Sequence, residues 1–490
     1  MNEAIDIGND KQLMLDQNLW AAREGVRLRV NRLQPDTRAV LEPSDEEQQR
    51  NLSFGYYSSV RQEEGRTRLW YFANSREDIL QRRVCYAESE DGIHFTRPAV
   101  NAHLAPHNAV LSDPVQGSCV WIDPQAPAAQ RYRSQAKWGP PAKFAGKGSS
   151  LHFYASPDGL DWKETHYLHL GDCDTQTVVF FDPKPGRYVM YTREWVRFED
   201  RNLNHRKVRR LESDDLHTWT SERVVWEADA EDLDRAQTSI GRPPVDIYGA
   251  CVFKYPQAGD LYIMLAQHFW HWQDRPEEER WGFSPDPENM ERRIVHLGPA
   301  VIDVRLGYSH DGITFDRAVD RGPFLPVGPD GRFDSRGAWI LPDPIIRDED
   351  IVFYYAGTNR DHDGFVDPTA SQRRSAIGRA VLRLDGFVGA EADAGGGWLV
   401  TPPLCFDPGE LELNVAASAG GRIKVEVLDE ELCGIPGFSG DDSPWLCGDS
   451  VRLPVRWAGQ SLSTLAGRPV QFRFSMHEAE LYSFRVVAGN

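Results

Sequence analysis

The sequence predicts an all-β protein in which a five-bladed β-propeller is followed by a C-terminal β-sandwich. Three observations support this prediction. A motif of the form S-x-D-x-x-x-(W/F) recurs, as SEDGIHF (89–95), SPDGLDW (156–162), SDDLHTW (213–219) and SHDGITF (309–315). A second series of β-prone segments runs in phase with this motif, and the composition changes after Asp385.

Each copy of the serine-aspartate motif predicts a strand, a tight turn and a second strand. A short β-prone run such as VCYAES, LHFYAS or VRLGYS precedes the motif, and an aromatic residue that opens another run ends it. The Asp-Gly pair supplies the positive φ that a tight hairpin requires. We therefore interpret the motif as scaffold that fixes the phase of the blades.

The second series contains five copies: RLWYF, RYRSQ, RYVMY, LYIMLA and IVFYYA. Another β-prone run precedes each copy, so that one unit consists of four antiparallel strands, the composition of a propeller blade. The last unit, GRAVLRLDGF, keeps Asp385 and Gly386 but lacks the serine. We expect a strand from elsewhere in the chain to complete this last blade.

Three regions are predicted. Residues 1–47 form a segment that packs on the propeller or on the seam between the domains, residues 48–388 form the propeller, and residues 389–490 form the β-sandwich. The stretch GAEADAGGGW is interpreted as a linker, and LELNV, RIKVEVLD, SVRLPVRW, PVQFRFSM and LYSFRV as the short strands of the sandwich.

The amino-acid composition excludes several classes of binding partner. The 490-residue chain has a net charge of −19, which argues against non-specific binding to nucleic acid or to an anionic membrane. The first residues are acidic and polar and lack the features of a secretory signal, so a cytoplasmic protein is expected. The seven scattered cysteines contain no C-x-x-C pair and are predicted to be reduced thiols.

Acidic residues stand near the start of every predicted inner strand. The catalytic candidates are Asp113, Asp174, Asp246, Glu46 and Glu47, and Asp334 is a substrate-binding candidate on the same face. Carboxylates that converge on one pocket acquire different proton affinities, which permits acid and base roles. A capping role for each individual acid stays open.

The remaining substrate-binding candidates are Arg193 at the exit of a predicted strand, Asp303 at the start of another, and Gln176, together with Trp270, His268, Asp361 and His362 in long predicted loops on that face. His268, His271 and His362 leave a metal-dependent site open as an alternative, although no metal is assigned. The chain has no G-x-S-x-G elbow, P-loop or dinucleotide fingerprint, and no cofactor is expected.

The blade phrases YAESEDGIHFTRP, FYASPDGLDW and GYSHDGITFDR resemble those of the five-bladed propeller glycosidases of glycoside hydrolase families 32 and 43. The resemblance implies three axial acids: an aspartate nucleophile or base, a second aspartate that tunes it, and a glutamate proton donor. Asp174 matches the second aspartate, Asp246 lies where the proton donor is expected, and Glu46 or Glu47 stands for the first group. No N-D-P-N-G, R-D-P or E-C motif is present.

The sequence thus predicts an enzyme that cleaves a glycosidic bond, with furanosidic bonds among those considered, in an oligosaccharide or glycoside. Two alternatives stay open: a non-catalytic carbohydrate-binding propeller and a metal-dependent carbohydrate lyase or isomerase.

Overall fold

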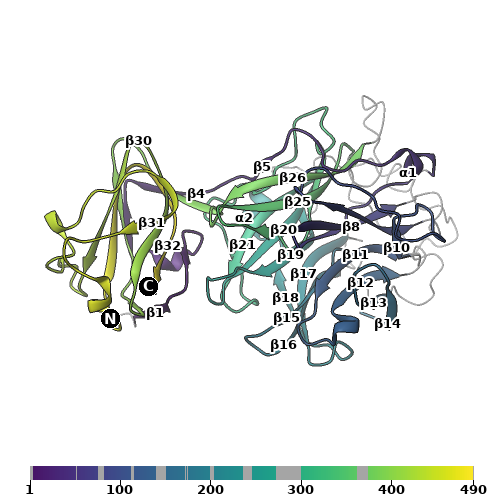
Figure 1. Ribbon diagram of the computed structural model, residues 1–490, viewed down its shortest axis with the longest axis horizontal. Coiled ribbons are helices and arrows are strands. Elements are labelled where there is room, and N and C mark those ends of the chain that lie inside the picture. The colour runs from purple at the N-terminus through teal and green to yellow at the C-terminus, as the bar shows by residue number, and fades with distance from the viewer. Residues whose placement is uncertain are drawn as a thin grey trace.

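The protein is nearly all-β and has two lobes (Figure 1). This computed structural model describes residues 4–50, 52–74, 82–111, 115–138, 150–170, 173, 175–198, 203–235, 245–271, 300–360 and 374–488. Helices in this part of the chain are short, and the α-helices among them are α1 (Asp45–Gln49) and α2 (Ala230–Arg235).

The larger lobe begins with three antiparallel sheets that follow one another along the chain. The first contains β6 (Ser53–Phe54), β7 (Ser59–Glu63), β8 (Arg66–Asn74), β9 (Arg83–Ser89) and β10 (Ala109–Leu111). The second contains β11 (Val115–Ile122), β12 (Tyr132–Trp138), β13 (Ser150–Ser156) and β14 (Lys163–Leu168). The third contains β15 (Val178–Asp182), β16 (Arg187–Phe198), β17 (Leu203–Ser213) and β18 (Thr220–Trp226). In the second and third sheets the four strands pair in chain order, as the predicted units of four antiparallel strands require.

Two further groups form one nine-stranded sheet. The fourth group contains β19 (Val245–Lys254), β20 (Tyr262–His271), β21 (Ala300–Ser309) and β22 (Asp316–Arg317). The fifth contains β23 (Gly337–Ile340), β24 (Ile345–Ile346), β25 (Asp350–Thr358), β26 (Ser375–Arg383) and β5 (Gln34–Pro35). The parallel pair Ile302–Gly337 joins the two groups. A strand from a distant part of the chain was expected in the fifth group. This strand is β5, which comes from the N-terminal segment and pairs with β26.

The serine-aspartate motifs form tight turns, as predicted. In the first copy the Asp91 Oδ1 atom accepts hydrogen bonds from the backbone N–H groups of Ile93 and His94, both at 2.8 Å. The following Gly92 has a φ of 74°, and in the third copy Leu216 takes the equivalent position with a φ of 66°. An aspartate side chain that bonds the backbone two residues on is a common turn device.

These turns also join neighbouring groups. The backbone carbonyl of the turn glycine accepts a hydrogen bond from an aromatic side chain of the preceding group. The three bonds are Trp70 Nε1 to Gly159 at 2.6 Å, Tyr191 Oη to Gly312 at 2.7 Å and Tyr354 Oη to Gly92 at 2.7 Å. The last bond runs from the fifth group back to the first, so the motif fixes how the groups pack.

Further hydrogen bonds between neighbouring groups follow the same circular order. The bonds are Val120 N to Ser59 Oγ (3.0 Å), Gln135 Nε2 to Thr177 O (2.6 Å), Thr175 Oγ1 to Tyr248 O (3.2 Å), Gln267 Nε2 to Ile340 O (3.4 Å) and Arg61 Nη1 to Asp343 Oδ2 (2.6 Å). Each joins one group to the next, and the last joins the first group to the fifth. Hydrogen bonds between neighbouring groups therefore run through all five groups in a circle.

The smaller lobe is built on an eight-stranded sheet with two long bent strands, β30 (Glu410–Leu428) and β32 (Gln471–Val487). The prediction of separate short strands was wrong here, because each long strand joins two predicted segments. The register of β30 against β32 shifts between Ala417 and Arg422, and Glu478 in β32 has a φ of 45°. Such irregularities bend a strand without reversing it. The sheet also contains β31 (Asp449–Val455).

The stretch GAEADAGGGW is not a linker. It contains the strand β27 (Val388–Ala392), a tight turn, and the start of β28 (Gly397–Val400). Each strand has one partner from the N-terminal segment: β4 (Val26–Val30) pairs with β27, and β3 (Ala22–Glu24) pairs with β28. Both strands pair with β32 on their other side. Small residues suit β27 and β28 because each of these strands lies between two neighbours that come from distant parts of the sequence.

The N-terminal segment crosses between the lobes (Figure 1). Besides β3 and β4, the strand β2 (Gln12–Leu13) pairs with β32, and β1 (Ile5–Gly8) pairs with β29 (Leu404–Phe406). A single hydrophobic core continues across the seam, where the Phe387 ring stacks on Phe324 at 5.8 Å. In the part of the chain that the structure describes, we find no helix with the length and apolar character needed to cross a membrane.

Candidate functional site

A buried ion pair lies at the start of β19, where the strand groups meet. The Nε atom of Arg206, on β17, lies 2.8 Å from Oδ2 of Asp246, and the two side chains are 6% and 1% exposed. The Arg206 guanidinium also lies 4.2 Å from the centre of the Phe269 ring. The pair therefore joins the third and fourth groups in a water-poor environment.

Arg193 binds next to this pair. Its Nε and Nη2 atoms donate to the backbone carbonyl of Tyr248 at 3.0 and 2.6 Å, and its guanidinium lies 4.4 Å from the Tyr248 ring. The pairing of β19 with β20 is irregular between Ile247 and Gly249. Because a bulge removes a residue from the regular ladder, the carbonyl of Tyr248 is available to Arg193.

Aromatic side chains from three groups pack around Tyr248. The hydroxyl groups of Tyr248 and Tyr57 are 2.9 Å apart. The Tyr248 ring packs edge to face against Trp339, on which Tyr56 stacks at 3.7 Å. Aromatic surfaces beside charged and amide groups are typical of sites that bind organic ligands.

Two buried amides lie nearby. Gln176 donates from Nε2 to the carbonyl of Ser118 at 3.1 Å, and Gln267 donates to the carbonyl of Ile340. The Oε1 atoms of both residues are buried and lack a hydrogen-bond partner among the described residues. Buried acceptors of this kind normally bind a donor such as a hydroxyl group or a water molecule.

The structure brings two of the predicted site residues, Asp246 and Arg193, to Tyr248, because Arg193 and Arg206, the partner of Asp246, both lie over its ring. Gln176, a third predicted residue, binds the carbonyl of Ser118. Two other predicted residues, Asp113 and Asp174, lie outside the described residues, although Thr175 beside Asp174 donates to the Tyr248 carbonyl. Arg206 and Tyr248 were missed. The sequence NLNHRKVRR holds several basic residues, and only the register of the β16–β17 hairpin shows that Arg206 faces Asp246.

Asp334 and Asp303 have structural partners. Asp334 is buried and accepts hydrogen bonds from Arg332 Nε at 2.9 Å and from the Tyr355 hydroxyl at 2.6 Å. Asp303 accepts from Trp270 Nε1 at 2.7 Å and forms an ion pair with Arg305. These contacts occupy carboxylates that the sequence assigned to substrate, and Trp270 is bound in the same network.

His268 lies on the opposite face of β20 from Phe269. Its Nε2 atom accepts a hydrogen bond from Trp226 Nε1 at 3.2 Å, and burial lowers its pKa to about 3. The His271 side chain, Asp361 and His362 lie outside the described residues. Within the described part of the chain, no group of three or more His, Cys, Asp and Glu side chains is placed to hold a metal ion.

Glu47 is a capping residue. It forms a capping box with Ser44 at the start of α1, accepts from the Tyr71 hydroxyl at 2.7 Å and lies 3.3 Å from Arg97. Glu46 is half-buried and pairs with Arg50 at 3.4 Å. Because Glu47 has this complete set of partners, we leave both glutamates out of the proposed site. The pattern S-x-x-E at residues 44–47 is the sequence signal for such a box.

No family model and no curated protein sequence matches this chain. Solved structures with similar folds include a glycoside hydrolase, with 12% identity, a TM-score of 0.46, and coverage of 72% of this chain and 92% of that one. Others are an N-acetylgalactosamine deacetylase from F. plautii (13%, TM-score 0.46, 73% and 95%) and a β-1,2-mannobiose phosphorylase from Listeria innocua (12%, TM-score 0.46, 72% and 98%). All three are named for chemistry on sugars. Neighbours of this kind were expected from the resemblance to propeller glycosidases.

Proposed function

We propose that the chain is a carbohydrate-active enzyme that cleaves a glycosidic bond in an oligosaccharide or glycoside. The observation that carries the proposal is the buried Asp246–Arg206 pair at the meeting point of the strand groups. The five groups are proposed as the blades of one propeller, on the grounds of their circular contacts, and the eight-stranded sheet as a C-terminal β-sandwich. The proposed site then lies at the mouth of the propeller axis.

In the proposed reaction the bond between the anomeric carbon and the leaving oxygen breaks, and a protonated acid donates its proton to that oxygen. The resemblance placed Asp246 where the proton donor is expected, but an ion pair with Arg206 suits a carboxylate. We therefore assign Asp246 to face the positive charge that develops on the sugar ring, either as nucleophile or as the base that deprotonates water. Arg206 orients this carboxylate. Asp174, on the segment that leads to Gln176, is proposed as its partner acid.

The surrounding groups suit a sugar ring. The unpaired Oε1 atoms of Gln176 and Gln267 can accept hydrogen bonds from sugar hydroxyls. Tyr56, which is partly exposed and stacks on the buried Trp339, offers apolar surface against which the C–H face of a ring can pack.

One observation favours a second candidate, a sugar-binding protein without catalysis. Asp246 is fully buried and already paired with Arg206, so a substrate must reach a carboxylate that is held by the protein. A binding protein would use the same residues only to recognise hydroxyl groups.

The experiment that separates these functions measures product release and binding on the same substrates. Purified protein is incubated with aryl glycosides and oligosaccharides of fructose, arabinose, xylose and galactose, and released sugar is quantified. We expect release from at least one substrate, and its loss in Asp174→Asn and Asp246→Asn. Calorimetric binding without product from any member of the panel would contradict the enzyme and support the second candidate.

A further inference from the structure

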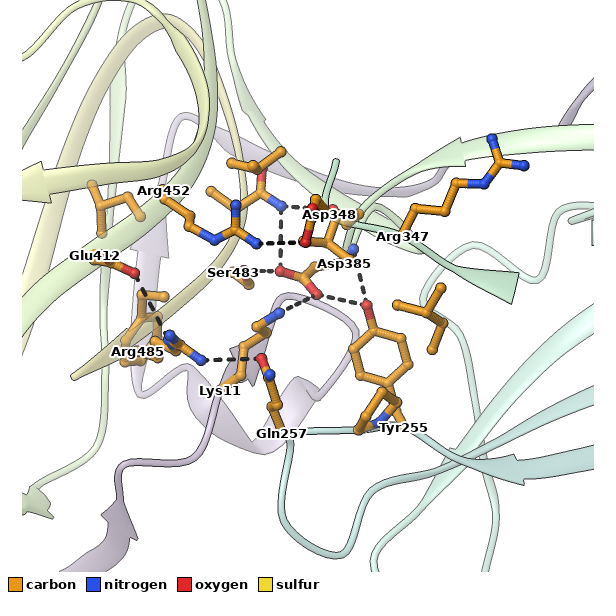
Figure 2. Close-up of a pocket in the computed structure, with 17 residues that line it drawn as sticks. Lys11, Tyr255, Gln257, Arg347, Asp348, Asp385, Glu412, Arg452, Ser483 and Arg485 are labelled. Atoms are coloured by element: carbon orange, nitrogen blue, oxygen red, sulfur yellow. Dashed lines mark hydrogen bonds and ion pairs between the residues drawn. The ribbon is translucent and has the colours of Figure 1, made fainter. Parts of the chain in front are cut away.

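A polar cavity of about 430 Å³ lies between the two lobes, away from the Asp246 site (Figure 2). One side is lined by the N-terminal segment, by the turn between β19 and β20, and by the residues just before β25 and just after β26. The strands β30, β31 and β32 line the other side. Its size falls within the range of pockets that bind small organic molecules.

The buried centre of the cavity wall is Asp385, the aspartate that the degenerate fifth motif keeps. Its Oδ1 atom accepts hydrogen bonds from Lys11 at 2.9 Å and from the Tyr255 hydroxyl at 2.7 Å. Its Oδ2 atom accepts from Ser483 at 2.6 Å and from Asn414 at 3.3 Å. The charges of Asp385 and Lys11 therefore compensate each other, and neither is available to a ligand.

Two guanidinium groups reach into the cavity from the smaller lobe, Arg452 from β31 and Arg485 from β32 (Figure 2). Arg452 lies 3.7 Å from Asp348, whose side chain is 98% exposed, and Arg485 lies 3.8 Å from Glu412. Both separations exceed hydrogen-bond length, and a pair with a fully solvated carboxylate contributes little. Arg347 also lines the cavity, but its guanidinium points away from it (Figure 2).

The donors of Arg452 are thus only weakly engaged, and they line the partly open polar cavity. A planar guanidinium binds a carboxylate or phosphate group through two parallel hydrogen bonds, more strongly than it binds a solvated surface acid. The amide of Gln257, which accepts from Arg485 at 3.1 Å, and the carboxylate of Glu412 offer further partners for hydroxyl groups.

We propose that this cavity is a second ligand site, which binds a small polyhydroxylated anion through Arg452 and Arg485. The charged group is a carboxylate, as in a sugar acid, or a phosphate, as in a sugar phosphate. The bound anion replaces Asp348 as the partner of Arg452 and connects the two lobes. The proposal does not depend on the proposed glycosidase activity, because none of its residues belongs to the Asp246 site.

The test is isothermal titration at low ionic strength with D-galacturonate, glucose 6-phosphate, inorganic phosphate and neutral D-galactose. We expect at least one of the two sugar anions to bind about tenfold or more tightly than galactose, and this binding to weaken as salt is added. The preferred sugar anion identifies the charged group, and inorganic phosphate shows whether the hydroxylated ring is needed. Galactose affinity equal to that of both anions would overturn the proposal.

Variants separate ligand binding from a structural role of these side chains. Arg452→Ala should weaken anion binding about tenfold or more. Arg452→Lys should keep only part of the wild-type affinity, because lysine has the positive charge but not the two parallel N–H donors of a guanidinium. Asp348→Asn should tighten binding, because it removes the competing acid. Arg468→Ala, an exposed arginine of the same lobe, is the matched control and should bind as the wild type does. Unchanged affinity in Arg452→Ala, or weaker binding in Asp348→Asn, would contradict the site.

Discussion

Asp246 and Arg206 form an ion pair whose side chains are almost completely buried, with 2.8 Å between Oδ2 and Nε. Arg206 comes from β17 and Asp246 from β19, so the pair joins two strand groups as well as forming the centre of the proposed site. Removing one partner of such a pair leaves a buried charge uncompensated, which destabilises a protein far more than removing both.

The variant Asp246→Asn should therefore lose activity and also about 3–5 kcal/mol of stability. The double variant Arg206→Met/Asp246→Leu should recover most of the stability, because neither charge is left unpaired, but it should stay inactive. Chemical denaturation and product release measured on the same preparations test both statements. Activity that returns together with stability would show that the pair is structural only.

The Ser-Asp turns should affect stability and not activity. Asp158 Oδ1 accepts hydrogen bonds from the N–H groups of Leu160 and Asp161 at 2.8 and 3.0 Å. Burial raises the pKa of Asp158, but these bonds outweigh it and the net shift is downward. Asp158→Ala should destabilise by about 1 kcal/mol after allowance for exposure, and this contribution should disappear as the pH falls below the normal range for aspartate.

Asp161→Ala is the matched control, since Asp161 belongs to the same turn and contributes its backbone N–H to Asp158. Its unfolding free energy should stay within about 0.5 kcal/mol of the wild type. Equal effects of the two variants, or a loss of activity in Asp158→Ala alone, would contradict the interpretation of the motif as scaffold.

His268 should make the stability depend on pH. Burial lowers its pKa from 6.5 to about 3, so the unfolded chain takes up a proton below pH 6.5 while the folded protein does not. The folded protein is therefore most stable above pH 6.5 with respect to this residue. As the pH falls from 7 to 5, protonation of His268 in the unfolded chain should lower the free energy of unfolding by about 2 kcal/mol. His268→Gln should reduce this slope in urea unfolding. Parallel pH profiles of the two proteins would contradict the assignment.

The hairpin between β7 and β8 should accept a stabilising substitution. Glu64 is exposed and has a φ of 49°, and the following Gly65 has a φ of 77°. Asparagine adopts this left-handed conformation more easily than glutamate, and Asn-Gly is the preferred pair for a two-residue hairpin turn. Glu64→Asn should raise the unfolding free energy by about 0.5–1 kcal/mol. Glu90→Asn, at a residue with ordinary negative φ, should give no such gain.

Local patterns account for most of what the sequence predicted correctly. The strands of the larger lobe and the Asp-Gly turns depend on neighbouring residues, and they were found where they were expected. The stretch GAEADAGGGW was misinterpreted because its strand β27 forms by pairing with β4, which is far away in the sequence. Its small residues look like a linker unless that partner is known.

The site was predicted less completely for a similar reason. Asp246 was identified from its position before a central strand, but its partner Arg206 depends on the register of a hairpin, which local composition does not fix. Asp334 was assigned to substrate because Arg332 and Tyr355, which bind it, are not recognisable as its partners in the sequence. For Glu47 the local capping pattern was present and was overlooked.

The N-terminal segment determines when the protein can fold during its synthesis. Residues 12–13 pair with the strand Gln471–Val487, and residues 34–35 pair with Ser375–Arg383. At about 5–20 residues per second, a ribosome needs roughly half a minute to a minute and a half between making the first partner and the last. During that interval the first strands to emerge have no partner, so nascent chains should depend on chaperones until translation ends.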